Sequence, residues 1–106
     1  MAVFFEWDRR KEELNLRKHG VAFVTASRVF DDPYLQSSRD VTSTEERWQT
    51  IGRVPGLDLL FVVHTVHQDE WEDETIRIIS ARFVTRKERY AYENEYHKTA
   101  HGTDET

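Results

Sequence analysis

The spacing of apolar residues separates helical from extended segments along the chain. Asp8 provides an N-cap for the run RRKEELNLRKHG, and Gly20 provides its stop. A second short helix fits Ala22 to Phe30, whose apolar side chains share one face, before the sequence DDP ends it. The pattern therefore predicts two helices in the N-terminal third, preceded by a short strand or apolar lead-in at Val3 to Trp7.

The middle of the chain reads as strands joined by turns. Residues 34–45 are rich in Ser and Thr and have no sustained period, so we expect a surface loop with room for a brief strand at its start. Pro55-Gly56 has the order of a type II turn and should close an antiparallel hairpin. Three segments have strand patterns: Glu46 to Val54, Leu59 to His67 and Ile76 to Val84.

A last helix should begin after Thr85, where Thr85 as N-cap and Glu88 three residues later form a capping box. A polar tail follows from about residue 99. The predicted fold class is α+β, with two N-terminal helices, an antiparallel sheet of three to four strands and a C-terminal helix. The helices are expected to cover one face of the sheet.

Composition narrows the function classes. The 106 residues fit one domain, and the absence of cysteine excludes disulfides and thiolate zinc sites. No apolar run has the length of a signal peptide or a membrane span, so we expect a cytoplasmic protein without membrane contact. The formal net charge of -5 argues against nucleic-acid binding over the whole surface. Any anion site must therefore be local.

Positive charge concentrates in the segment from Ile76 to Tyr92. Its cations are Arg77, Arg82, Arg86, Lys87 and Arg89. On a regular strand Arg77 and Arg82 point to opposite faces, so they can share a site only if a bulge intervenes or the strand ends before Arg82. Otherwise one of them is structural. Arg82 and Arg86 also lie near the start of the last helix, where free backbone amides favour anions.

Several motifs, in order from about Phe5 to Glu93, resemble the BrnT family of toxins. They are FFEWDRRKEELNLRKHGVAF, VFDDP, ER followed by IGR, VHT, and IRIISARFVTRKERYAYE. The resemblance implies a type II toxin with a RelE-like fold that cleaves RNA without a metal or cofactor and is neutralised by a BrnA-type antitoxin. The alternative is a non-catalytic toxin-like subunit that acts through its antitoxin complex. In either case, operator DNA would be contacted only through the antitoxin complex. The chain could form a homo-oligomer or a hetero-oligomer with the antitoxin.

Metal-free RNA cleavage requires a base near the 2′-hydroxyl, an acid near the leaving 5′ oxygen and cations over the phosphorane charge. Arg77 and Arg82 are the first candidates for the cations, because a guanidinium grips two phosphate oxygens and stays protonated. The alternative is that they are solvated or form structural ion pairs. His64 and Glu46 are candidates for proton transfer, with a core histidine and a solvated loop glutamate as the alternatives.

Further phosphate ligands are expected among cations near helix ends: Lys18, His19, Arg86 and Arg89. Lys18 and His19 also suit a purely structural position, because positive charge stabilises the last turn of a helix. His97 and His101 have helical spacing with nearby Glu95, yet a fourth ligand is missing, so no metal site is expected.

An acidic loop precedes the basic segment and departs from the family, whose members tend to be basic. Its carboxylates are Asp69, Glu70, Glu72, Asp73 and Glu74. They would either repel RNA or form a rim for a specific partner. Trp71 lies among them, where an indole has little to pack on, so we expect it to contact the antitoxin.

Overall fold

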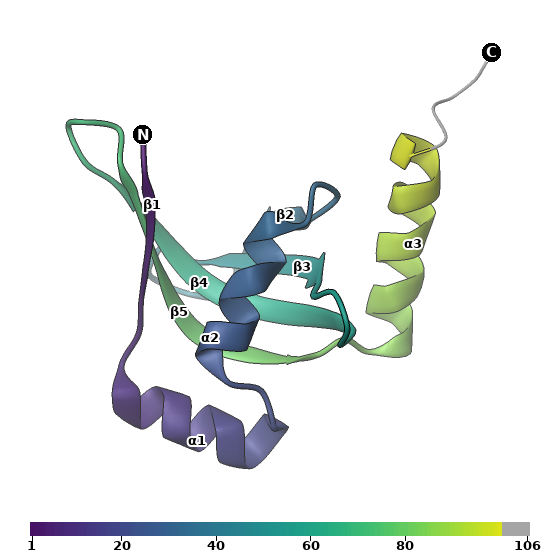
Figure 1. Cartoon of the computed structure of the whole chain (residues 1–106), viewed down its shortest axis with the longest axis horizontal. Coiled ribbons are helices and arrows are strands. Elements are labelled where there is room, and N and C mark those ends of the chain that lie inside the picture. The colour runs from purple at the N-terminus through teal and green to yellow at the C-terminus, as the bar shows by residue number, and fades with distance from the viewer. Residues whose placement is uncertain (101–106) are drawn as a thin grey trace.

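A five-stranded mixed sheet with helices packed beside it forms the fold of this computed structural model (Figure 1). The structure describes residues 1–100, with side chains through residue 97. The elements in chain order are β1 (Val3–Glu6), α1 (Arg9–His19), α2 (Phe23–Ala26), the 3₁₀ helix η1 (Ser27–Asp31), β2 (Gln36–Arg39), β3 (Trp48–Arg53), β4 (Leu59–Gln68), β5 (Glu74–Phe83) and α3 (Arg86–Ala100). His101 and the polar tail after it lie outside the described residues.

The sheet has the order β1-β5-β4-β3-β2, in which β2 to β5 are antiparallel neighbours and β1 lies parallel to β5. The prediction of three to four strands was therefore wrong in strand number, and the predicted antiparallel direction holds for β2 to β5 but not for β1. The apolar lead-in and the brief strand in the Ser/Thr-rich segment both join the sheet. A parallel strand pairs across a long crossover, so no local sequence pattern reports it.

The helix boundaries follow the predicted caps. The Asp8 carboxylate accepts the Lys11 N–H at 3.0 Å, and Gly20 ends α1 with a φ of 73°. The capping box is confirmed, since the Thr85 N–H donates to Glu88 at 2.9 Å and the Glu88 N–H donates to the Thr85 hydroxyl at 3.1 Å. These contacts satisfy amides that the first helical turn leaves without partners.

The second predicted helix forms only in part, as the short α2 followed by η1. Ala22 provides no side-chain hydrogen bond at the start of α2, and β-branched Val24 and Thr25 follow at once. Both features weaken an α-helix, and a tighter 3₁₀ turn continues the segment.

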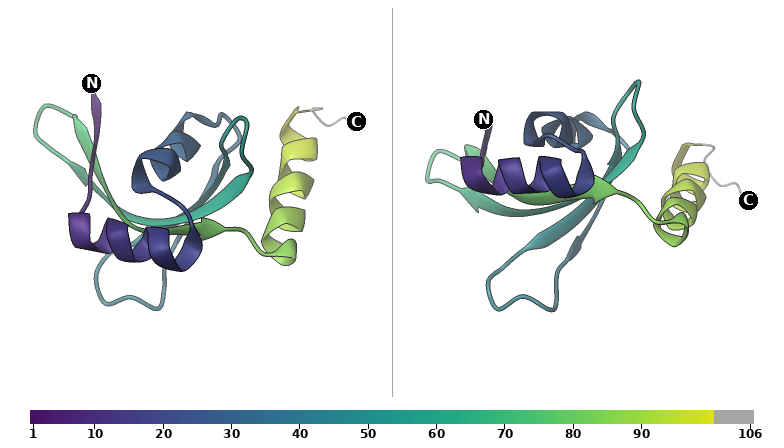
Figure 2. Two further views of the ribbon diagram at one scale, coloured as in Figure 1. Left: turned by 60° about the horizontal axis from the view of Figure 1, so that its bottom comes forward. Right: turned by 90° about the horizontal axis from the view of Figure 1, so that it is seen from below.

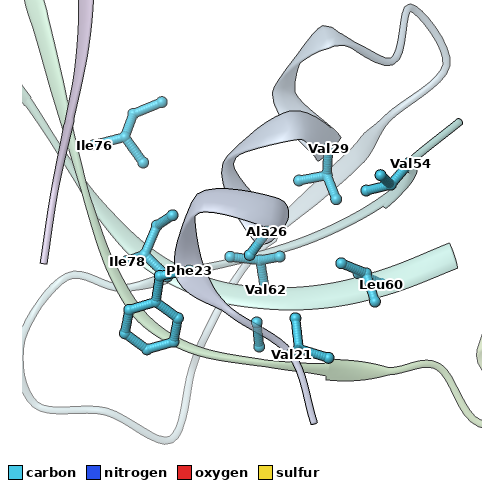
Figure 3. Packing of buried hydrophobic residues seen from close by; sticks show 10 residues of the cluster. Val21, Phe23, Ala26, Val29, Val54, Leu60, Val62, Ile76 and Ile78 are labelled. Atoms are coloured by element: carbon cyan, nitrogen blue, oxygen red, sulfur yellow. The ribbon is translucent and has the colours of Figure 1, made fainter. Parts of the chain in front are cut away.

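The hydrophobic core lies between one face of the sheet and the segment formed by α2 and η1 (Figures 2 and 3). Its buried members are Val21, Phe23, Ala26, Val29, Val54, Leu60, Val62, Ile76, Ile78 and Ala81. A Cβ on Gly52 would lie 2.8 Å from the Val29 Cβ, so this glycine permits η1 to approach β3. We call this side of the sheet the covered face and the other side the open face.

Helix α3 lies to one side of the sheet in all three ribbon views, so it does not join the other helices over the covered face (Figures 1 and 2). Tyr92 anchors it: the side chain is buried, and its hydroxyl donates to Asp32 at 2.6 Å. The expectation that the helices together cover one face therefore holds for α2 and η1 but not for α3, and α1 lies along the edge of β5, where Asn15 bonds the backbone of Ala81. A capping box fixes where a helix begins, but it does not fix where the helix packs.

Candidate functional site

A β-bulge in β5 brings Arg77 and Arg82 to the open face of the sheet. Arg77 pairs with Thr65 and Arg82 pairs with Phe61, while the register shifts by one residue between Val63 and His64. Without that shift, the five-residue separation would place the two arginines on opposite faces. The sequence predicts that the two arginines can share a site if a bulge separates them. This bulge is present, and both cations lie on the side of the sheet away from the core.

The two arginines are too far apart to hold one phosphate together from their observed positions. Their partners on β4 are separated by four residues, which corresponds to about 13 Å of strand. Between β2 and the start of α3 the open face contains a hollow of about 330 Å³, whose lining includes Gln36, Gln49, Phe61 and Glu88. This arrangement suits an extended anionic chain that meets the two arginines at different points.

Arg82 is held firmly by its neighbours. Its guanidinium donates two hydrogen bonds of 2.9 Å to the Glu88 carboxylate and lies 4.1 Å above the centre of the Phe61 ring. The hydrogen bond from Arg82 holds the pKa of Glu88 below its ordinary value. Glu88 therefore stays ionised and compensates part of the positive charge at this end of the open face.

Arg77 is paired with Glu45 and not with its neighbour Glu46, the residue predicted as a candidate for proton transfer. Glu45 Oε1 lies 3.4 Å from Arg77 Nη2 and accepts a hydrogen bond of 3.2 Å from Arg47 Nε. Glu46 instead pairs with Arg39 at 3.4 Å. Which of these two adjacent glutamates faces β5 depends on how their loop enters β3.

His64 lies on the covered face, so the sheet separates it from Arg77 and Arg82. It is buried, its Nε2 is 2.7 Å from the Thr50 hydroxyl, and its Nδ1 is 3.3 Å from the Thr65 carbonyl. Burial lowers the pKa of His64 below its ordinary value. These contacts match the alternative of a hydrogen-bonded core histidine.

The predicted phosphate ligands occupy different environments. Lys18 and His19 line a hollow of about 210 Å³ beside Ile79 and Ser80, at the bulge itself. Arg86 is exposed in the first turn of α3 and forms no ion pair with a described residue. The structure thus brings Lys18 and His19 to the part of β5 that lies between the two arginines.

Arg89 has a structural partner. It donates to Asp58 Oδ2 at 2.9 Å, and this hydrogen bond lowers the pKa of the Asp58 carboxyl. The pair joins α3 to the turn before β4. Trp71 lies elsewhere, in the loop between β4 and β5, with 73% of its surface exposed.

Asn15 was not singled out by the sequence, although it holds the bulged strand in place. Its amide nitrogen donates to the carbonyls of Val21 and Ala81 at 2.9 and 2.8 Å, and its oxygen accepts the Ala81 N–H at 3.0 Å. The pairing of β1 with β5 ends at Arg77. Further along β5, the Asn15 side chain makes the hydrogen bonds that a neighbouring strand would otherwise make. A polar residue in a helix that is otherwise exposed gives little signal in the sequence.

A larger hollow of about 510 Å³ lies between η1, the turn after β3, and α3. Its lining includes Tyr34, Arg53, Tyr92 and Tyr96, and none of the predicted site residues. The candidate site is therefore the open face, where the two arginines lie, and not this larger hollow.

The described part of the chain offers neither a membrane-spanning helix nor a cluster of metal ligands. Within residues 1–100, no helix is long and apolar enough to cross a membrane. Among the described side chains, no three His, Cys, Asp or Glu residues are grouped so that they could hold a metal ion.

Comparisons with known proteins agree with this fold. Residues 7–88 match the model of a family described as ribonuclease toxin, BrnT, of type II toxin-antitoxin system. Among solved structures, the chain is similar to the Brucella abortus ribonuclease toxin BrnT, known from a 1.1 Å crystal structure, with a TM-score of 0.56 and 20% sequence identity. The match covers 81% of this chain and 100% of that chain. No curated protein matches the chain.

Proposed function

Because the chain belongs to the BrnT family of ribonuclease toxins of type II toxin–antitoxin systems, we propose that it cleaves RNA on the open face of its sheet. The observation that carries this proposal is the bulge, which places Arg77 and Arg82 on that one face. An RNA strand lying across β4 and β5 would meet the two guanidiniums at different phosphates. Lys18, which lies with His19 beside the bulge, adds positive charge between them.

In the proposed reaction the ribose 2′ oxygen attacks the adjacent phosphorus, and the bond from phosphorus to the 5′ oxygen breaks. Glu45 accepts the proton of the 2′-hydroxyl, because its carboxylate lies beside Arg77. The leaving 5′ oxygen takes a proton from His19 or Lys18. The arginines stabilise the charge that develops on the phosphoryl oxygens. His64, on the covered face, serves packing.

The family resemblance also supports proposals about the metal requirement of the reaction, the antitoxin and the operator DNA. We propose that cleavage needs no metal ion, that a BrnA-type antitoxin neutralises the chain, and that the complex of the two contacts operator DNA. A RelE-like fold, one domain over residues 1–106 and a cytoplasmic location complete it.

Cleavage of labelled RNA in EDTA tests the proposal. Arg77→Ala and Glu45→Gln should each lower the cleavage rate by about 100-fold or more, as loss of a preorganised transition-state contact does. Arg28→Ala is the matched control, because Arg28 is an exposed arginine on η1, away from the open face. No cleavage by the wild type would refute the enzyme proposal. Equal cleavage by Arg77→Ala and the control would remove the open face from the mechanism.

One observation favours the second candidate, a non-catalytic subunit that acts through its antitoxin complex. Both arginines already have carboxylate partners, and the Arg82 pair is bidentate. A growth assay with and without the antitoxin, run beside the cleavage assay, separates the two candidates. Toxicity relieved by the antitoxin together with RNA cleavage supports the ribonuclease, whereas antitoxin binding without cleavage supports the second candidate.

A further inference from the structure

Strand β1 leaves one edge of the sheet unpaired among the described residues. It is the terminal strand in the order of the sheet, and all four of its residues are exposed. Backbone groups of alternate residues in an edge strand point away from the sheet, so they can pair with another extended segment. Within the chain itself, β1 is held only on its β5 side.

Large apolar side chains surround this edge. Val3, Phe4 and Phe5 are 53%, 55% and 37% exposed, and Trp71 in the neighbouring loop is 73% exposed. The loop of residues 69–73 extends past the sheet beside the N-terminal end of β1 (Figure 1). Two hydrogen bonds of 2.8 Å fasten them together, from the Ala2 N–H to Asp73 and from the Glu74 N–H to the Ala2 carbonyl. We call β1 together with residues 69–73 the β1 edge surface.

Negative charge distinguishes this surface from the open face. None of the carboxylates of residues 69–74 forms an ion pair with a described cation. Asp69 and Asp73 accept backbone N–H groups, while Glu70 and Glu72 are exposed. Such a surface repels RNA, and two copies brought edge to edge would repel each other. It is complementary to a basic partner.

We infer that the β1 edge surface binds the antitoxin, which adds an extended segment with basic and apolar side chains as a strand next to β1. This docking mode uses main-chain hydrogen bonds for affinity and side-chain contacts for specificity. Trp71 is the apolar anchor, and the carboxylates of the loop receive Lys or Arg side chains of the segment. The inference rests on the proposed pairing with an antitoxin, and it places that contact apart from the RNA site.

Titration calorimetry with the purified cognate antitoxin tests the inference. Trp71→Ala should raise Kd by about tenfold or more, because buried tryptophans are frequent hot spots. Glu70→Lys should also raise Kd, and the effect should shrink at high salt. The matched controls are Tyr90→Ala, whose ring is also 73% exposed but lies on α3, and Glu13→Lys, an exposed charge reversal on α1. Both controls should leave Kd unchanged.

Hydrogen exchange provides the backbone readout, since the outward amides of β1 should gain protection in the complex. The inference is overturned if Trp71→Ala binds like Tyr90→Ala, or if β1 gains no protection. If the wild type does not bind the antitoxin, the proposed pairing fails as well. Loss of RNA cleavage in Trp71→Ala would assign the loop to the RNA site, and self-association that depends on Trp71 would make a second copy the occupant. Either result also overturns the inference.

Discussion

Replacement of Asn15 by alanine should strongly destabilise the protein. Asn15 is buried and makes three hydrogen bonds, one to the Val21 carbonyl and two to the backbone of Ala81. Truncation leaves those three backbone groups without their partner. At roughly 1 kcal/mol or slightly more for each group, Asn15→Ala should reduce the free energy of unfolding by about 3–4 kcal/mol. This is a large fraction of the stability of a typical domain.

Urea denaturation followed by tryptophan fluorescence measures this loss. Asn94→Ala is the matched control, because Asn94 is exposed on α3, and it should change the free energy of unfolding by less than about 0.5 kcal/mol. Asn15→Asp retains an acceptor for the Ala81 N–H but loses both donated hydrogen bonds and buries a charge, so it should be no more stable than Asn15→Ala. A loss below about 1 kcal/mol in Asn15→Ala would refute the assignment of Asn15 as the residue that holds β5.

Two other predictions concern packing and protonation. Gly52→Ala should lower the free energy of unfolding by about 1–3 kcal/mol, because the new methyl group overlaps Val29. Thermal melts measure this loss, with the exposed Ser38→Ala as the control. An unchanged Tm in Gly52→Ala would contradict the close approach of η1 to β3. For His64 the folded-state pKa lies below the ordinary value of 6.5, so the unfolded chain takes up the proton first. Stability should therefore be complete above about pH 6.5 and decline as the pH falls below that value. In urea titrations at several pH values, His64→Gln should lose this part of the pH dependence. His67→Gln, on the exposed end of the same strand, should keep it. Identical profiles for both variants would contradict the assignment of this pH dependence to His64.

The features that the sequence predicted well are those fixed by neighbouring residues. Asp8 and Gly20 bound α1 because capping depends on side chains within one turn of the helix end. The turn at Pro55-Gly56 forms for the same reason: Gly56 has a φ of 80°, which a type II turn requires, and the Leu57 N–H donates to the Val54 carbonyl at 3.0 Å.

The arrangement of the candidate site depended on contacts between distant residues. Alternation along β5 showed that Arg77 and Arg82 need a bulge to share a face, but the stabilising partner of that bulged strand, Asn15, lies 66 residues from Ala81. The choice of Glu45 over Glu46 beside Arg77 depends in a similar way on the path of a loop. Local periodicity cannot report either arrangement, because both are decided by tertiary packing.

The parallel pairing of β1 with β5 also has a consequence for the order in which the chain folds. Strands β2 to β5 are each adjacent in sequence to a strand they pair with, whereas Val3 pairs with Glu74, 71 residues further along the chain. Closing so long a loop is entropically unfavourable until the partner strand is already in place. We therefore expect β1 to join the sheet only after its partner β5 is in place.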